Sequence, residues 1–162
     1  MKGGLMLIYY YILTLIALFV DQRIKWAVVH DMELGQSIPI IKNVFHLTSS
    51  RNRGAAFGIL QNQRLFFIII TCIVVIGIIY YLHKIYKEKR LLAIALSLIM
   101  GGALGNFVDR AFKGEVVDML DFNLIDYPIF NAADSFISIG ATIIILINVM
   151  EAWQEHRKNS LM

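Results

Sequence analysis

The sequence predicts a membrane protein of the all-α class, with four transmembrane helices and a small extracytoplasmic β-sheet between the first two helices. Composition is the first reason: hydrophobic residues make up 58% of the 162 residues and charged residues only 17%, whereas soluble domains contain about 45–50% and about 25%. The second reason is that four stretches are long and apolar enough to cross a bilayer, which takes about 20 helical residues. An ordinary soluble enzyme and a disordered chain are therefore excluded. The length predicts one integral-membrane domain over residues 1–162.

The four predicted spans cover about residues 5–26, 65–82, 91–109 and 129–150. In the first span, Asp21 and Lys25 stand four positions apart and share one helix face. The second span carries no charge over 18 residues, or about 27 Å of helix. Pro128 precedes the fourth span, where proline suits the first turn of a helix. Each stretch is therefore expected to form one membrane-spanning helix.

The extracytoplasmic segment 27–64 between the first two spans is too long to be a plain linker. Its residues 36–50, QSIPIIKNVFHLTSS, are rich in β-branched and aromatic side chains with partial alternation, and Gly54 and Gly58 follow. We expect one or two strands and a turn here, lying against the membrane surface.

Basic residues indicate the direction of the spans. The short connection 83–90 carries four of them, and the C-terminal tail adds Arg157 and Lys158. Because cytoplasmic loops are enriched in lysine and arginine, both segments and both termini are expected in the cytoplasm. Segment 21–64, which this orientation places largely on the outer side, does not fit the rule well, because it contains six basic residues spread over 44 positions. The dense cluster near the span ends carries more weight, and nine of the twelve acidic residues then lie on the outer side.

Polar residues at the end of the third span need an explanation, because a charge inside a membrane helix costs about 2.5–3.5 kcal/mol. Asn106, Asp109 and Arg110 share one helix face after a glycine-rich run at 101–105. A packing seam of small residues with an interfacial arginine is the plain alternative. It does not explain Asp109, since a carboxylate near a helix C-terminus opposes the helix dipole. We therefore expect this cluster to build a site.

The fourth span opens with a polar stripe on an otherwise apolar helix. Asn131, Asp134 and Ser138 recur at spacings of three and four, with Ser135 beside Asp134. An acid in the first helical turn complements the helix dipole, which explains Asp134 alone. The other members of the stripe should face protein or water rather than lipid.

Asp118 is a further candidate for a reactive acid, because a pair of apolar residues flanks it on each side. Most other acids of segment 113–127 are expected to be solvated. A short re-entry of the chain would place Asp118 opposite Asp134, at the mouth of the third and fourth helices. Two carboxylates that close do not both ionise readily, so one is suited to act as a general base and the other as a general acid.

Three alternatives use the same residues differently. A small proton or ion conductor also uses intramembrane acids, but it predicts polar residues through the full depth of the spans, and stretches 68–79 and 143–147 have almost none. A purely structural membrane subunit leaves the polar stripes unexplained. A serine–lysine peptidase needs a lysine at the depth of the fourth-span serines, and Lys25 is already matched with Asp21.

Five short motifs occur in an order that matches one known family. They are DQRIK (21–25), RNRGAAFG (51–58), GGALGNFVDR (101–110), EVVDML (115–120) and FNAADSFI (130–137). Together with the four-span plan, they resemble the bacterial lipoprotein signal peptidases, also called signal peptidase II. The resemblance extends from about residue 5 to residue 150, and five motifs in register make it specific where any one would be weak.

The resemblance implies an intramembrane aspartyl endopeptidase, a hydrolase that removes the signal peptide from prolipoproteins just before a cysteine carrying a diacylglyceryl group. The catalytic pair it implies is Asp118 and Asp134. Asp21 and Lys25 match a motif in which we expect a structural ion pair. The family also implies that segment 36–60 forms a small sheet that cradles the substrate. The residues that match its substrate-binding and site-positioning motifs are Asn52, Gly54, Asn106, Asp109, Arg110, Asn131 and Ala133.

The same resemblance implies the partners: diacylglyceryl-prolipoprotein substrates, membrane lipids and the inhibitor globomycin. We expect a monomer in the bacterial cell membrane, with its active site near the outer face and no cofactor. The four histidines lack the spacing of a metal site, and a net charge of +3 is too small and dispersed for nucleic acid. The loop acids Asp121 and Asp126 are assigned no role.

Overall fold

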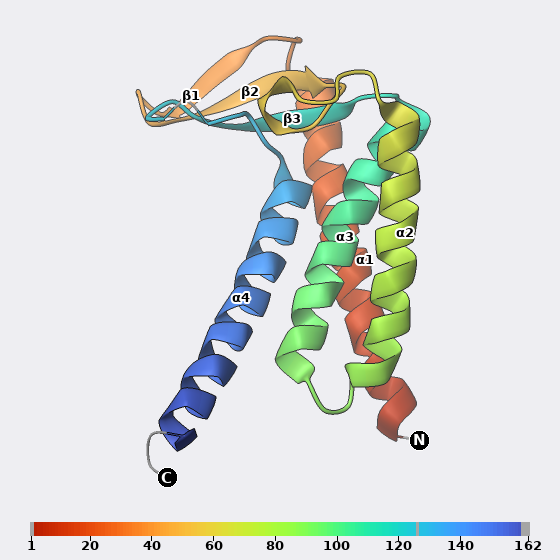
Figure 1. The fold of residues 1–162 in the computed structure, drawn as a ribbon. Helices are drawn as coiled ribbons and strands as arrows, with labels where there is room; N and C mark the ends of the chain where they lie inside the picture. The colour runs from red at the N-terminus through yellow and green to blue at the C-terminus, as the bar shows by residue number, and fades with distance from the viewer. Residues whose placement is uncertain (1, 126, 160–162) are drawn as a thin grey trace.

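The computed structural model describes residues 2–125 and 127–159 as four long helices capped at one end by a small sheet (Figure 1). All four helices are long and apolar enough to cross a membrane, which confirms the predicted class. We call the end at the sheet the sheet end, and the end where α1 begins and α4 ends the opposite end. Asp126, which was assigned no role, lies outside the described residues. The helices are α1 (Lys2–Asp31), α2 (Arg64–Ile85), α3 (Arg90–Phe112) and α4 (Ala132–Asn159).

The helices differ from the predicted spans at their ends. The first three are longer than predicted, whereas α4 begins at Ala132, three residues later than predicted. The preceding residues are extended because Phe130 pairs with Leu120: each backbone N–H donates to the other's carbonyl oxygen, at 3.1 and 2.8 Å. α4 continues past residue 150 to Asn159, so the described part of the predicted tail is a continuation of this helix.

The sheet has three antiparallel strands in the order β1-β2-β3. β1 (Ser37–Ile41) and β2 (Phe45–Asn52) come from the connection between α1 and α2, as predicted. β3 (Val116–Phe122) comes from the connection between α3 and α4, where a short re-entry was expected instead of a strand. β3 pairs with β2 so that Asp118 lies opposite Ser50. The sheet therefore joins the two inter-helix connections at this end of the bundle.

Burial explains why the segment around Asp118 forms a strand. Val117 and Met119 are buried in one cluster with Val28 and Met32, at the end of α1. β-branched and apolar residues suit a strand that packs on a helix end, where alternate side chains reach the core. This packing fixes β3, and with it Asp118, above the sheet end of α1.

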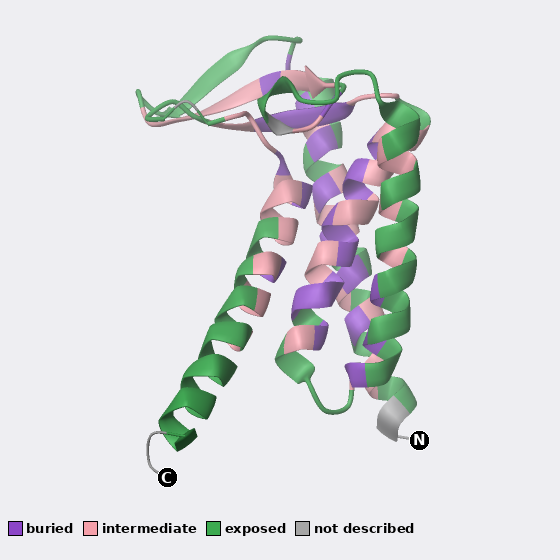
Figure 2. Cartoon of the chain, viewed as in Figure 1, coloured by how far each residue is buried: buried purple, intermediate pink, exposed green. Residues whose placement is uncertain are grey.

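α3 lies among the other three helices, and the buried residues follow its length (Figure 2). Glycines allow the close approach: a Cβ on Gly101 would lie 2.6 Å from the Cβ of Ala17 in α1, and a Cβ on Gly102 would overlap the carbonyl oxygen of Ala133. The outer face of α2 exposes large apolar side chains such as Ile76, which is typical of a surface that contacts lipid.

Candidate active site

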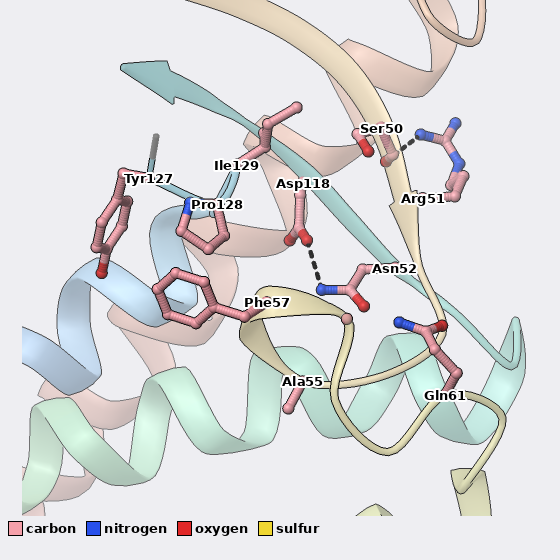
Figure 3. A pocket seen from close by; sticks show the side chains of 11 residues that line it. Ser50, Arg51, Asn52, Ala55, Phe57, Gln61, Asp118, Tyr127, Pro128 and Ile129 are labelled. Atoms are coloured by element: carbon pink, nitrogen blue, oxygen red, sulfur yellow. Dashed lines mark hydrogen bonds between the residues drawn. The ribbon is translucent and has the colours of Figure 1, made fainter. Parts of the chain in front are cut away.

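Asp118 lies on β3 with only 3% of its surface exposed. Its Oδ1 accepts a hydrogen bond from Nδ2 of Asn131 at 2.6 Å, and its Oδ2 accepts one from Nδ2 of Asn52 at 3.0 Å. Figure 3 shows the Asn52 amide directed at this carboxylate from the end of β2. Two amides from different segments therefore fix the orientation of both carboxylate oxygens.

Burial raises the pKa of Asp118 from its ordinary value of 3.8 to about 6. The hydrogen bonds from Asn52 and Asn131 act in the opposite sense, because they stabilise the charged form. The negative charge of Asp134 raises the pKa further. Asp118 therefore exchanges a proton near pH 6, about two pH units above an ordinary exposed aspartate.

Asp134 is the third residue of α4, and its position depends on the helix start. Asn131 caps α4: its Oδ1 accepts from the N–H of Asp134 at 3.0 Å, and Oδ2 of Asp134 accepts from the N–H of Asn131 at 3.3 Å. This reciprocal pair is a capping box, which satisfies backbone donors at a helix start. The other oxygen of Asp134, Oδ1, accepts from Nδ2 of Asn106 at 2.8 Å.

Asn131 connects the two acids. Its amide nitrogen donates to Asp118, while its amide oxygen accepts from the backbone of Asp134. The same nitrogen lies 3.2 Å from Oδ1 of Asn106, so the fourth-span and third-span amides are also joined. The structure thus brings Asp118 and Asp134, expected as a pair from the sequence, into one hydrogen-bonded network.

A buried group of charges lies next to this network. Nζ of Lys25 is 2.8 Å from Oδ2 of Asp21 and 2.9 Å from Oδ2 of Asp109, and all three side chains have no exposed surface. Nζ of Lys25 also donates to Oδ1 of Asn106 at 2.8 Å. Oδ2 of Asp109 is buried and accepts no hydrogen bond from the described residues, so its contact with Lys25 is an ion pair only. Asp109, which was expected in the substrate cleft, thus lies in this ion cluster and lines neither of the two cavities beside Asp118.

The ion cluster is coupled to the start of α4. Oδ1 of Asp21 accepts a hydrogen bond from the N–H of Ala133 at 2.8 Å. Ala133 is fully buried, and its Cβ lies 3.3 Å from the place where a Cβ on Gly105 would be. Only a small side chain fits at position 133, between α3 and α1. Asp21 and Ala133 therefore set where α4 begins, and so where Asp134 lies.

Two cavities meet at Asp118. The first, of about 350 Å³, is lined by both acids together with Asn106, Arg110 and Ser138, among others. The second, of about 500 Å³, shares Asp118 and residues 127–129 with the first and is also lined by strand β2 and the loop that follows it (Figure 3). Asp118 is thus accessible from both, although its own exposed surface is small.

Arg110 fastens the loop after β2 to α3. Its Nη2 donates to the carbonyl oxygen of Gly54 at 2.9 Å, and its guanidinium lies 4.3 Å from the ring centre of Phe67. The N–H of Gly54 donates in turn to Oδ1 of Asn52 at 2.8 Å. A side chain at position 54 would meet the carbonyl oxygen of Ile59 at 2.5 Å, so the loop closes only on a glycine.

Phe57 and Tyr127 are site residues that the sequence analysis missed. They line the larger cavity from opposite segments, and their rings meet edge to face with centres 6.4 Å apart. The backbone of Phe57 is left-handed, with φ of 59°. This conformation is uncommon for phenylalanine, and the local sequence does not predict it. Only the position of Tyr127 beside Pro128, before the polar stripe, gave a usable signal.

Comparison with known proteins decides the family. The family model described as signal peptidase (SPase) II matches residues 13–150. The chain belongs to the signal peptidase II family. This confirms the resemblance of the five motifs and makes the chain a peptidase, and therefore a hydrolase.

Relatives and solved structures agree with membership of the signal peptidase II family. The "Lipoprotein signal peptidase" of Brevibacillus brevis is 55% identical over 85% of this chain and 93% of its own length. That of Bacillus subtilis is 47% identical over 92% of this chain and 98% of its own length. Two solved structures of a bacterial membrane enzyme share the fold, with TM-scores of 0.82 and 0.77. They are 38% and 39% identical; the first covers 89% of both chains, and the second covers 86% of this chain and 91% of its own.

The described residues include no group of three or more histidine, cysteine, aspartate or glutamate side chains arranged to hold a metal ion. What the site offers is two carboxylates, several amides and one arginine around connected cavities.

Proposed function

We propose that this chain is an intramembrane aspartyl endopeptidase that removes the signal peptide from prolipoproteins, by cleaving before the diacylglyceryl-modified cysteine. The observation that carries the proposal is the joining of Asp118 and Asp134 through Asn131 at one cavity. The names of the relatives, which are lipoprotein signal peptidases, support the choice of substrate.

The chemistry follows from the two acids. One carboxylate is ionised and takes a proton from a water molecule as the water oxygen attacks the carbonyl carbon of the scissile peptide bond. The other carboxyl group donates its proton to the carbonyl oxygen. When the tetrahedral intermediate collapses, the carbon–nitrogen bond breaks and the leaving nitrogen receives a proton from the pair. The raised pKa of Asp118, about 6, supports a role for this carboxyl group as a proton donor and acceptor near pH 6.

The substrate reaches the acids from the membrane. Its signal helix enters from the bilayer, its lipid chains remain there, and the residues near the scissile bond extend across the two cavities. The amides Asn52, Asn106 and Asn131 hold the carboxylates in place, while Arg110 holds the loop that lines the cleft, so little reorganisation is needed during reaction. The inhibitor globomycin, a cyclic peptide, is proposed to occupy the same cleft.

We propose that the sheet end faces the outside of the bacterial cell membrane and that both termini are cytoplasmic. α1 begins and α4 ends at the opposite end, next to the basic connection between α2 and α3. The active site then lies near the outer face, and the chain acts as a monomer. No metal or organic cofactor takes part in the proposed reaction.

The test is cleavage of a purified diacylglyceryl-prolipoprotein by the full chain in detergent, with the unlipidated form in parallel. Asp118→Asn and Asp134→Asn are each expected to lower the cleavage rate by about 10²–10⁴-fold, because asparagine keeps the shape but cannot exchange the proton. The parental chain is expected to cleave only the diacylglyceryl-modified form, and this cleavage is expected to stop on addition of globomycin.

Asp121→Asn is the matched control. Asp121 lies on the same strand as Asp118, but its Oδ2 accepts from the Thr48 hydroxyl at 2.8 Å and it lines neither cavity. This variant should cleave at the parental rate. A near-parental rate for Asp118→Asn or Asp134→Asn, in protein with unchanged circular dichroism, would disprove the proposed pair.

A proton or ion conductor is poorly supported by the burial of polar groups. In the described residues, every buried charged side chain lies at the sheet end. Nearer the opposite end, Thr14 and Ser97 are buried, but their hydroxyls donate to backbone carbonyl oxygens within the helices. A charged pathway therefore does not continue through the bundle.

A further inference from the structure

A polar cavity of about 330 Å³ lies at the sheet end, separate from the two active-site cavities. It forms where the loop between β2 and α2 meets the turn between α3 and β3, on the side of the bundle where α2 begins (Figure 1). None of its lining residues lines either cavity at Asp118. They are Arg53, Asn62, Arg64, Lys113, Gly114 and Glu115.

The lining of this cavity is positively charged, with three basic side chains against one acid. Glu115 is paired with Arg53, whose Nε lies 3.0 Å from its Oε2. Lys113 lies 3.0 Å from Asp109, whose other cation, Lys25, is shared with Asp21. Lys25, Asp21 and Asp109 together carry one negative charge, which Lys113 neutralises. The lining therefore keeps one uncompensated positive charge, that of Arg64.

Arg64 has the least neutralised charge of the three. Its Nη2 donates to the carbonyl oxygen of Ala111 at 2.6 Å, and it forms no ion pair with any carboxylate of the described residues. Gly114 in the turn packs beside this group, since a Cβ there would lie 3.8 Å from the Arg64 guanidinium. Guanidinium groups bind phosphate in a fixed planar geometry, which makes Arg64 suited to such a ligand.

Large apolar side chains stand directly beside this cavity. Leu65 and Phe66 follow Arg64 in the first turn of α2, and Phe112 precedes Lys113 at the end of α3. Leu65 is 69% exposed and Phe112 is 81% exposed. α2 begins and α3 ends at this level of the bundle. A basic cavity next to exposed apolar side chains at a membrane boundary fits a ligand with an anionic head and apolar chains.

We propose that this cavity binds the phosphate headgroup of an anionic phospholipid. The phosphate lies among Arg53, Arg64 and Lys113, and the acyl chains lie along the apolar side chains at the ends of α2 and α3. Arg53 of this site is the first residue after β2 and directly follows Asn52, which donates to Asp118. A bound lipid therefore restrains the loop between β2 and α2 from outside the active site.

The experiment measures lipid retention by the full chain, purified in a neutral detergent, with native mass spectrometry. Phosphatidylglycerol is titrated against phosphatidylcholine. The parental chain is expected to retain phosphatidylglycerol in preference. Each basic residue near a membrane surface changes affinity about fivefold, so Arg64→Gln with Lys113→Gln should weaken phosphatidylglycerol binding about 25-fold and leave phosphatidylcholine binding unchanged.

The matched control removes the same charge at the opposite end. Lys84→Gln with Lys87→Gln changes two exposed lysines in the turn region between α2 and α3, and should keep the parental preference. Arg64→Gln alone is the second variant, with an expected loss of about fivefold, in case the double variant does not fold.

Three results would overturn the proposal. The first is a parental preference for phosphatidylglycerol in both Arg64 variants, and the second is an equal loss in the control. The third is binding of glycerol 3-phosphate with no retention of phosphatidylglycerol by the parental chain, which would mean that the cavity takes free phosphate compounds and not a membrane lipid. None of these results depends on whether the chain cleaves prolipoproteins.

Discussion

The two ends of the helix bundle are held together in different ways. At the sheet end, helices α1, α3 and α4 meet through the buried charges of Lys25, Asp21 and Asp109 and through hydrogen-bonded amides. At the opposite end, α1, α2 and α3 meet through an apolar cluster that includes Leu82 and Met100. Both ends contain buried residues, but α4 is exposed toward the opposite end, where the buried cluster lies among the other three helices (Figure 2).

The two kinds of packing, apolar at the opposite end and charged at the sheet end, contribute differently to stability and to function. Apolar packing stabilises by about 25 cal/mol per Å² removed from water and is tolerant of small changes. Burying charges costs several kcal/mol per ion, and only complete pairing compensates for it. A chain that keeps such groups at one end uses them to position something, and here they position the start of α4 and Asp134. Changes at the two ends should therefore affect stability and catalysis in different proportions.

The largest effect is expected for Lys25→Met, which leaves Asp21 and Asp109 buried without their shared cation. We expect the free energy of unfolding to fall by about 3–5 kcal/mol and cleavage to be lost, because Asn106 also loses its ammonium donor. Unfolding in mixed detergent micelles measures the change. The exposed Lys84→Met should stay within about 0.5 kcal/mol of the parent. A change below about 1 kcal/mol for Lys25→Met would show that the cluster is not required.

Leu82→Ala should destabilise the opposite end without touching the site. Leu82 is fully buried in the apolar cluster, so the variant is expected to lose about 2–5 kcal/mol of unfolding free energy. The cleavage rate per folded molecule should remain parental, measured below the unfolding midpoint. A large fall in that rate would contradict the expectation that changes at the opposite end affect stability and not cleavage.

Asp118→Asn should change how stability depends on pH. Because folding raises the pKa of Asp118 from 3.8 to about 6, the native state holds the proton more tightly than the unfolded state. The contribution of Asp118 to stability is complete below pH 3.8 and is lost as pH rises through about 6. The asparagine variant has no such proton. Its free energy of unfolding should therefore rise relative to that of the parent by up to about 3 kcal/mol between pH 4 and pH 8.

Unfolding of the parent and of Asp118→Asn at several pH values measures this gain, and Asp121→Asn serves as the comparison for an acid on the same strand. A constant difference between parent and Asp118→Asn across this pH range would show that the carboxylate is not held in a buried environment.

The smallest effect is expected for a matched pair of glycines. Gly102→Ala forces a Cβ into the carbonyl oxygen of Ala133, so α3 and α4 must separate, at a cost of about 1–3 kcal/mol. Gly77→Ala in α2 adds a Cβ in open space and should be neutral or slightly stabilising. The Gly102 variant should also cleave more slowly, because Ala133 is next to Asp134. Equal unfolding free energies for the two variants would argue against close α3–α4 packing.

Local sequence signals were enough to predict the four helices, the first two strands and the proximity of Asp118 and Asp134. Long apolar stretches identify membrane spans, and polar residues within or beside those stretches identify candidate sites. Neither signal requires knowledge of the rest of the fold. β3 was not predicted, because a strand of seven residues is fixed by its pairing with distant β2 and its packing on α1. The partner of Asp109 was missed for the same reason, since Lys25 comes from another helix.

The pairing of β3 with β2 has a consequence for when the peptidase becomes active. Asn52 precedes Asp118 by 66 positions, and Asn131 follows it by 13. During synthesis Asn52 is therefore made before Asp118, and Asp118 meets both of its amides only after Asn131, at the start of α4, has been made. The hydrogen-bonded network around Asp118 therefore cannot form before the start of α4 has been synthesised.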